Sequence, residues 1–385
     1  MKIALLSEKY TPDIGGLAIS AARFARLLSS VEHQIRVFAP TLNLPASEKR
    51  TLPSSGISVT RFGAHKRVDD TFLDWFELII EEHKREPFDV LNAYFLTQAG
   101  FVAAYAGNYL NVPSVVSIRG NDLERAIFDP SRAAHISYAL HHAKVVTTNA
   151  NELAKKAKAL IPNLEVTVIP NGIDTEHFRP ITRNKALAES LGLIEEGNTE
   201  ETSWVIGFAG ELREKKGLHP LLAAYTQVNK KKPALLLIVG DIRTGEDQQN
   251  FQAFKLANPE ARIIVTGFVS PNDLPSYYSL MDVFVHPSLR DGLPNALLEA
   301  MACEKAVIGT SVGGILDAVS DCENGRLVPA KDSAQLASAI NELLSDNEQR
   351  KKLGMAARQT IINSFSPHQE LQGNLDVYRS LGLNP

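Results

Sequence analysis

Short apolar runs alternate with segments of helical hydrophobic spacing along most of the chain. Runs such as KIALLS (residues 2–7) and SVVSI (114–118) are rich in strand-forming residues, whereas residues 20–30 and 97–110 space their apolar side chains three and four positions apart. The alternation resumes at WVIGFAG (204–210) and continues to residue 344. A repeated strand-then-helix pattern predicts parallel βαβ units, so we expect an α/β protein with doubly wound sheets.

A polar stretch after Pro180, ending in GNTEETS (197–203), divides this pattern into two halves. Because 385 residues exceed what one hydrophobic core usually supports, we expect two Rossmann-like domains, residues 1–177 and 178–365, followed by a final helix over 366–385. Ligands of such sheets bind at the carboxyl ends of the strands. Two domains facing each other would therefore enclose a cleft.

Composition narrows the classes of protein that fit this fold. The net charge of −4 argues against a nucleic-acid partner, which needs clustered Lys and Arg. The two cysteines, Cys303 and Cys322, form no CxxC pair, so neither a disulfide framework nor a zinc site is expected. The opening MKIALLS is too short for a signal peptide, and no run approaches the ~20 apolar residues of a membrane span. We expect a cytoplasmic protein, with at most weak peripheral contact at the inner face of the membrane.

The two halves begin alike, each with a strand, a glycine-bearing loop and a helix. In PDIGGLAIS, Gly15 and Gly16 leave bare amides that an anion can approach, although the motif is not GxGxxG and a tight turn is the alternative. In GELREKKGLHPLL, the cations Arg213, Lys215 and Lys216 precede a helix and suit a diphosphate. A solvated charged face is the alternative for that segment.

The stretch HPSLRDGLPNALLEAMA (286–302) combines carboxylates with the start of a helix. Pro294 suits the first helical position, which predicts free amides on the next three residues and hence a seat for phosphate. Because carboxylates repel phosphate, we expect them to accept hydrogen bonds from hydroxyls attached to the phosphates. A ligand with hydroxyls on both sides of a diphosphate is a nucleotide-sugar. The candidate residues are Asp291, Gly292, Leu293, Pro294, Asn295, Ala296, Leu297 and Glu299; the alternative is that both acids are surface residues.

Three other segments carry weaker signals. SIRGNDLER ends a strand with Arg119 and Asp122, which also suit a turn. IPNGIDTEHFRP (169–180) has the composition of a turn between domains. Residues 69–86 form an amphipathic helix that could dock on a membrane or an apolar acceptor, but its acidic outer face favours core packing.

Together these motifs resemble the retaining GT-B glycosyltransferases of family 4, over essentially the whole chain. The resemblance implies transfer of a hexosyl unit from a nucleotide-sugar, a UDP- or GDP-hexose, to an acceptor hydroxyl. It also implies an acceptor-side first domain, a nucleotide-sugar-binding second domain and a last helix that crosses back to the first. The acceptor would be a carbohydrate, a lipid-linked sugar or a small molecule, in polysaccharide or glycolipid assembly.

The resemblance also assigns roles to single residues. Gly16 would lend its amide to the diphosphate, and Lys216 would be the diphosphate lysine. Glu299 would bind the ribose and Asp291 would face the donor sugar. Residues around Phe268 and Val269 would contact the base, and Asp122 matches an acid of the family. We count as catalytic Arg213, Lys216, Asp291 and Asp122.

Three positions depart from the family pattern. Asp291 stands where Glu is usual, Glu211 fills the place of a common arginine, and Arg119 replaces a histidine. The expected mechanism stabilises the leaving diphosphate with Arg213, Lys216 and the helix amides, without a metal or cofactor. A front-face reaction is favoured, since no carboxylate nucleophile is evident. Two alternatives remain: a nucleotide-sugar epimerase of the same fold, and a non-catalytic nucleotide-sugar sensor.

Overall fold

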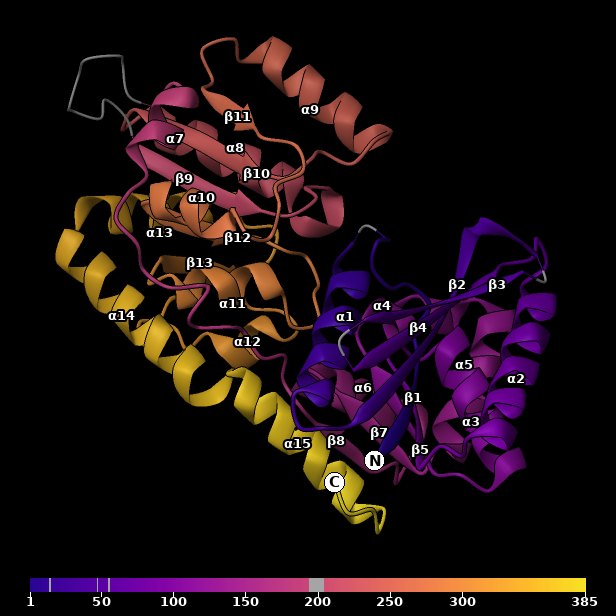
Figure 1. Cartoon of the computed structure of the whole chain (residues 1–385). Coiled ribbons are helices and arrows are strands. Elements are labelled where there is room, and N and C mark those ends of the chain that lie inside the picture. Colours follow the sequence, from indigo (N-terminus) through magenta and orange to yellow (C-terminus); the bar gives the residue numbers. More distant parts are fainter. Residues whose placement is uncertain (14, 47, 55, 194–203) are drawn as a thin grey trace. The chain divides into compact units, whose positions relative to one another are not determined.

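A computed structural model describes residues 1–385 except 14, 47, 55 and 194–203, and it divides into two compact units (Figure 1). The first unit consists of residues 1–170 and 368–385, and the second of residues 171–367. The sequence-derived boundary at residue 177 thus falls inside the second unit. The polar segment GNTEETS lies outside the described residues.

The first unit is built on one sheet with the strand order β3-β4-β2-β1-β5-β6-β7-β8. All neighbouring strands run parallel except β3, which pairs antiparallel with β4 at the edge. The strands are β1 (Lys2–Leu6), β2 (Gln34–Ala46), β3 (Lys49–Ser54), β4 (Ile57–Gly63), β5 (Val90–Ala93), β6 (Ser114–Ile118), β7 (Val145–Thr148) and β8 (Val166–Val168).

Helices cover both faces of this sheet. One face packs against α2, α3, α5 and α6 through residues such as Trp75, Val102 and Leu140, and the other packs against α1 and α15 through Phe24 and Tyr378. The helices are α1 (Gly16–Ser29), α2 (Val68–Arg85), α3 (Gln98–Leu110), α4 (Asn121–Glu124), the 3₁₀ turn η1 (Ala126–Phe128), α5 (Pro130–His142), α6 (Asn151–Leu160) and α15 (Pro367–Ser380).

The last helix completes the core of the first unit, although it follows the whole second unit in sequence. The buried Glu370 of α15 accepts hydrogen bonds from both terminal nitrogens of Arg23 in α1. The buried hydroxyl of Tyr378 donates to Oδ1 of Asn92 in β5 at 3.0 Å. These contacts make α15 part of the first unit.

The second unit has a parallel sheet in the order β11-β10-β9-β12-β13-β14. The strands are β9 (Trp204–Ala209), β10 (Ala234–Val239), β11 (Ile263–Val265), β12 (Val283–His286), β13 (Ala306–Thr310) and β14 (Arg326–Val328). The chain leaves β9 toward β10 on one side and later returns to β12 on the other. The order therefore reverses between β9 and β12, and such switch points are where open α/β sheets bind ligands.

Two helical layers also enclose the second sheet. One apolar core joins it to α7, α10, α11 and α14, and the other joins it to α8, α9 and α13. The helices are α7 (Lys185–Ser190), the 3₁₀ turn η2 (Glu214–Lys216), α8 (Leu218–Asn229), α9 (Glu246–Ala257), α10 (Leu274–Leu280), α11 (Asn295–Ala302), α12 (Ile315–Ala318), α13 (Ser333–Ser345) and α14 (Asn347–Ser364).

The amphipathic helix α2 packs as expected on its apolar side. Phe72, Trp75 and Ile79 are buried in the first core. Glu82, expected on the acidic outer face, is instead buried and paired with Arg36 and Arg85. None of the helices in the described residues is long and apolar enough to cross a membrane.

Candidate active site

Three loops of the second unit meet at the carboxyl ends of β9, β12 and β13. The backbone N–H of Leu289 donates to the carbonyl of Lys215 at 2.9 Å, which joins the loop after β12 to the loop after β9. The N–H of Gly314 donates to the carbonyl of Gly292 at 2.7 Å, which joins the loop after β13. The sequence-predicted residues 213–217 and 291–297 are thereby brought together at the switch point of the sheet.

Gly217 permits the close approach of the first two loops. Its φ of +83° lies in the left-handed region, and a Cβ there would come within 2.1 Å of the carbonyl oxygen of Pro287. Both the dihedral and the contact require glycine. This turn places Lys216, the residue before it, beside Asp291.

One carboxylate oxygen of Asp291 is the centre of the site. Oδ2 accepts hydrogen bonds from Nζ of Lys216, from Nε2 of His286 at 3.0 Å and from Oγ of Ser288 at 3.2 Å. Burial alone would raise the pKa of this carboxyl, but Lys216 and His286 outweigh burial and hold the pKa well below its usual range. Asp291 is therefore ionised at neutral pH.

His286 ends β12 and lies inside the unit. Its side chain is buried, and its ring runs nearly parallel to those of Phe208 and Phe284, with centroids 6.2 and 6.3 Å away. Burial lowers the pKa of this imidazole, with help from Lys216, while Asp291 acts in the opposite direction. The net lowering leaves the ring neutral at pH 7.

The other predicted cations surround this centre less closely. Arg213 is partly buried, with one guanidinium nitrogen 3.5 Å from Oε2 of Glu211. Lys215 is partly buried and contributes its carbonyl to Leu289. The charge of Arg213 is thus only partly offset by Glu211, and Lys216 is the cation in direct contact with Asp291.

The helix that follows Asp291 begins one residue later than expected. Pro294 is the N-cap of α11 rather than its first residue, and its carbonyl accepts the N–H of Leu297 at 3.2 Å. The prediction of a free amide at Leu297 is therefore wrong, because the first turn is tightened by this contact. Asn295 starts the helix and accepts a hydrogen bond from Nδ2 of the buried Asn171 at 2.8 Å.

Glu299 and the residues expected to contact the nucleotide base lie on different elements of the second unit. Oε2 of Glu299 accepts the hydroxyl of Tyr278 in α10 at 2.8 Å. Phe268, in the loop after β11, is 68% exposed, and Val269 is partly buried against the core. The ribose and base roles of these residues stay predictions.

In the first unit, the side chain of Asp122 forms hydrogen bonds with backbone N–H groups. It is fully buried, and its carboxylate accepts the N–H groups of Leu96, Arg119, Gly120 and Leu123. Burial raises its pKa to about 6, although the bonds from Arg119, Leu96 and Gly120 act in the opposite direction. This geometry holds two loops together, and a direct catalytic role stays a prediction.

The remaining predicted residues of the first unit lie at loop ends. Arg119 places its guanidinium 3.9 Å from the centroid of the Tyr94 ring, a cation–π contact. Gly15 caps α1 with a φ of +127°, and no described residue has an atom within 4 Å of where a Cβ of Gly15 or Gly16 would stand. The space at these glycines is compatible with the predicted anion contact.

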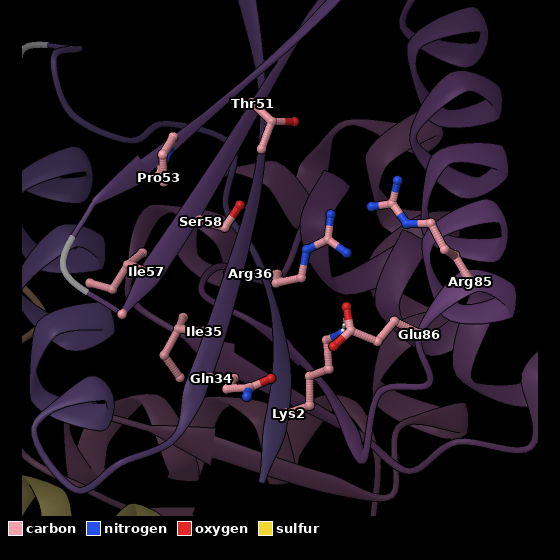
Figure 2. A pocket seen from close by; sticks show the side chains of 11 residues that line it. Lys2, Gln34, Ile35, Arg36, Thr51, Pro53, Ile57, Ser58, Arg85 and Glu86 are labelled. Atoms are coloured by element: carbon pink, nitrogen blue, oxygen red, sulfur yellow. Dashed lines mark ion pairs between the residues drawn. The ribbon is translucent and has the colours of Figure 1, made fainter.

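A cavity of about 430 Å³ lies elsewhere, at the amino ends of β1, β2 and β4 (Figure 2). Figure 2 shows Lys2, Arg36 and Arg85 around it. These cations are paired, Lys2 with Glu86 and both arginines with Glu82, so little charge is left to attract an anion. Ligands of such sheets bind at the opposite edge, where the carboxyl ends of the strands lie, so the candidate site remains the one in the second unit.

Sequence reasoning missed His286, Ser288 and Asn171 as members of the site. The signal available for His286 was its position: a polar residue two places after Phe284 shares the inward face of β12. Asn171 was read as a turn residue, and its bond to Asn295, 124 positions away, leaves no trace in the sequence. No group of three or more acids, histidines or cysteines that could hold a metal occurs among the described residues.

Comparisons with known proteins agree with this architecture. Residues 14–177 match the family described as Glycosyltransferase Family 4, and residues 193–360 match the family described as Glycosyl transferases group 1. An uncharacterised glycosyltransferase of Methanocaldococcus jannaschii is 26% identical, with 98% of each chain covered. A capsular polysaccharide biosynthesis glycosyltransferase of Staphylococcus aureus is 29% identical over 75% of this chain and 76% of that protein. The solved structure of Anabaena HepE in complex with UDP-glucose has a TM-score of 0.80 at 20% identity, covering 99% of this chain and 100% of that one.

Two Rossmann-like units of this topology define the GT-B fold, which the sequence predicted and the structural likeness confirms. The chain belongs to the family 4 glycosyltransferases.

Proposed function

We propose that this glycosyltransferase moves a hexosyl unit from a UDP- or GDP-hexose to an acceptor hydroxyl with retention of anomeric configuration. The observation that carries the proposal is the meeting of Lys216, Asp291 and the start of α11 at the switch point of the second sheet. A cation and a helix start suit a diphosphate, and an ionised acid beside them suits the hydroxyls of a sugar.

The donor's parts can be assigned along this edge. The diphosphate would take Lys216 away from Asp291, because phosphate carries more negative charge than the carboxylate and accepts the same hydrogen bond. Asp291 would then accept from a hydroxyl of the donor sugar. Glu299 would accept from the ribose, and the exposed ring of Phe268 would lie against the base.

The proposed reaction is a front-face substitution. The bond between the anomeric carbon and the diphosphate oxygen breaks, and its electron pair stays on the diphosphate, where Lys216 and Arg213 stabilise the charge. The acceptor oxygen bonds to the anomeric carbon from the same face, and its proton passes to the departing phosphate. Configuration is retained without a carboxylate nucleophile.

The relatives support an acceptor in glycan assembly. The Staphylococcus aureus relative is named for capsular polysaccharide biosynthesis, and the Anabaena neighbour was solved with UDP-glucose. We infer a carbohydrate or lipid-linked sugar as acceptor and a cytoplasmic place of action, where nucleotide-sugars are available.

The test is a donor screen followed by product analysis. A panel of UDP-, GDP- and ADP-sugars should contain one that stabilises the protein by about 2.7 kcal/mol at 100 times its Kd. Proton NMR of the transferred sugar should then show the anomeric configuration of the donor. An inverted product would refute retention. Conversion of the donor with no acceptor present would indicate an epimerase, and tight binding without turnover or hydrolysis would indicate a sensor.

Removal of metal ions tests the charge assignment separately. Because Lys216, Arg213 and the start of α11 supply the positive charge, transfer should continue in EDTA at the untreated rate. Loss of activity in EDTA, restored by Mg²⁺ or Mn²⁺, would show that a cation performs the role we give to the side chains.

A further inference from the structure

The hydrogen bonds of Asp291 are unevenly divided between its two oxygens. Lys216, His286 and Ser288 all donate to Oδ2, whereas Oδ1 has no hydrogen-bond partner among the residues that the structure describes. If Lys216 turns to a diphosphate, as the proposed function requires, two neutral donors remain on Oδ2. Of these, His286 at 3.0 Å is the closer.

The surroundings of His286 determine where its proton lies. Nδ1 is buried and has no hydrogen-bond partner within the described part of the chain. A proton on Nδ1 would be a buried, unsatisfied donor. The hydroxyl of Ser288, 3.1 Å from Nε2, can donate to Nε2 in that tautomer, but the lone pair of Nε2 would still face the carboxylate of Asp291. A proton on Nε2 instead donates directly to Oδ2 of Asp291. The neutral Nε2–H tautomer is therefore the stable one.

The position of the ring is also fixed without help from ligand contacts. His286 ends a strand in the middle of the sheet and lies among aromatic rings, nearly parallel to Phe208 and Phe284. A side chain held on all sides by a packed core loses little further freedom when a ligand binds. The N–H of His286 is thus a rigid donor, whereas the ammonium group of Lys216 is at the end of a long, flexible side chain.

We propose that His286 is a positioning residue: its Nε2–H holds Oδ2 of Asp291 in place while Lys216 moves to the diphosphate, which leaves Oδ1 for a hydroxyl of the donor sugar. This inference rests on the proposed function, since it assigns His286 a task only in the sugar-transfer step. His286 itself touches neither the sugar nor the diphosphate.

Two substitutions separate the hydrogen bond from the packing. H286F keeps an aromatic ring beside Phe208 and Phe284 but has no N–H to donate. H286Q loses the ring, but its side-chain amide carries an N–H donor that can reach Asp291. If the hydrogen bond matters, the glutamine variant should outperform the phenylalanine variant, although phenylalanine is the better match for the core.

We expect H286F to lower kcat by about 10- to 100-fold, the scale of losing one hydrogen bond to a charged group. Its Kd for the bare nucleoside diphosphate, measured by titration calorimetry, should stay within about twofold of the wild type, because that ligand lacks the sugar. H286Q should recover kcat to within about fivefold of the wild type. Wild-type turnover in H286F, or equal losses in both variants with nucleotide binding intact, would overturn the inference.

A second measurement does not depend on turnover. The ¹⁵N chemical shifts of the His286 ring in the wild type, without added nucleotide, should report a neutral Nε2–H tautomer. An Nδ1–H tautomer or an imidazolium at pH 7 would overturn the inference even if H286F is inactive or fails to fold. If the wild type transfers no sugar from any donor, the proposed function fails and the inference fails with it. Equal transfer by wild type and H286F refutes the positioning role alone.

Discussion

Lys216 and Asp291 form an ion pair in the structure, so their opposite charges lie in direct contact. Part of the low pKa of Asp291 comes from this lysine, which means that the pair acts as one unit. A diphosphate would compete with the carboxylate for the ammonium group. Substitutions at the two positions should therefore differ in which ligand and which kinetic constant they affect.

Removal of Lys216 should chiefly slow the chemical step. K216A is expected to lower kcat by about 10²–10³, the scale seen when one preorganised donor is removed from a developing negative charge. Steady-state kinetics on the preferred donor measure this, with K231A, at an exposed lysine of the same unit, as the control. Turnover close to wild type in K216A would transfer the charge role to a neighbouring cation.

The two acids should separate binding from catalysis. E299A should weaken the donor and the free nucleoside diphosphate alike, because a ribose contact is the same before and during bond breaking. D291A should leave the affinity for free nucleotide nearly unchanged and depress kcat. Titration calorimetry beside steady-state kinetics distinguishes them. An equal loss of nucleotide affinity in both variants would contradict this division.

For single residues of the candidate site, the sequence indicated which residues to expect but not which of them contact each other. Lys216 was identified as one of three cations that precede a helix, and Asp291 as a carboxylate beside a predicted helix start. Their direct pairing, across 75 positions, depends on the order of strands in the sheet and could not be read from local pattern. His286 was passed over for the same reason: a buried polar side chain becomes informative only when its partner is known.

Among the elements, the turn between η2 and α8 has a strict steric requirement for glycine at position 217. G217A would combine a left-handed φ with a Cβ placed 2.1 Å from the carbonyl oxygen of Pro287. The chain would have to move, and Lys216 with it. G245A is a control for backbone strain without a clash, because Gly245 also has a positive φ, +96° with ψ −135°, but open space around it.

We expect G245A to cost about 1–2 kcal/mol of unfolding free energy and G217A about 3 kcal/mol or more. The first value reflects backbone strain alone, and the second adds the steric clash. Denaturant unfolding of both variants measures the difference. Donor affinity should fall only in G217A. Equal costs would show that the loop after β12 yields easily to the added methyl group.

The sequence pattern predicted the parallel strands and their crossover helices, since buried strands with flanking helices carry a strong periodic signal. The antiparallel pair β3–β4 was not predicted, because Pro53 and the polar residues of KRTLPS weaken any strand signal there. The long helix α14 was also passed over. Few of its residues are buried, so it lacks the wide apolar stripe by which helices are recognised.

At the scale of the whole molecule, the first unit depends on a helix from the far end of the chain. E370A would leave the guanidinium of Arg23 without its buried partner and should lower the unfolding free energy by up to about 3 kcal/mol. Hydrogen exchange should show reduced protection in α1, β1 and β5, with β9 and β12 unchanged. D376A, which removes an exposed ion pair of the same helix, should cost about 0.5 kcal/mol or less. Reduced protection confined to residues 171–367 would show that α15 stabilises the second unit and not the first.

The discontinuity of the first unit also bears on how the protein is made. The ribosome releases residues 1–170 first, yet the buried partners of Arg23 and Asn92 belong to residues 368–385. The second unit is one uninterrupted segment and can reach its final contacts as soon as residue 367 has emerged. Domains emerging during synthesis usually fold in the order of the chain. Here the unit translated first is the last to be finished, and until then the apolar face that α15 will cover is open to chaperones and to other nascent chains.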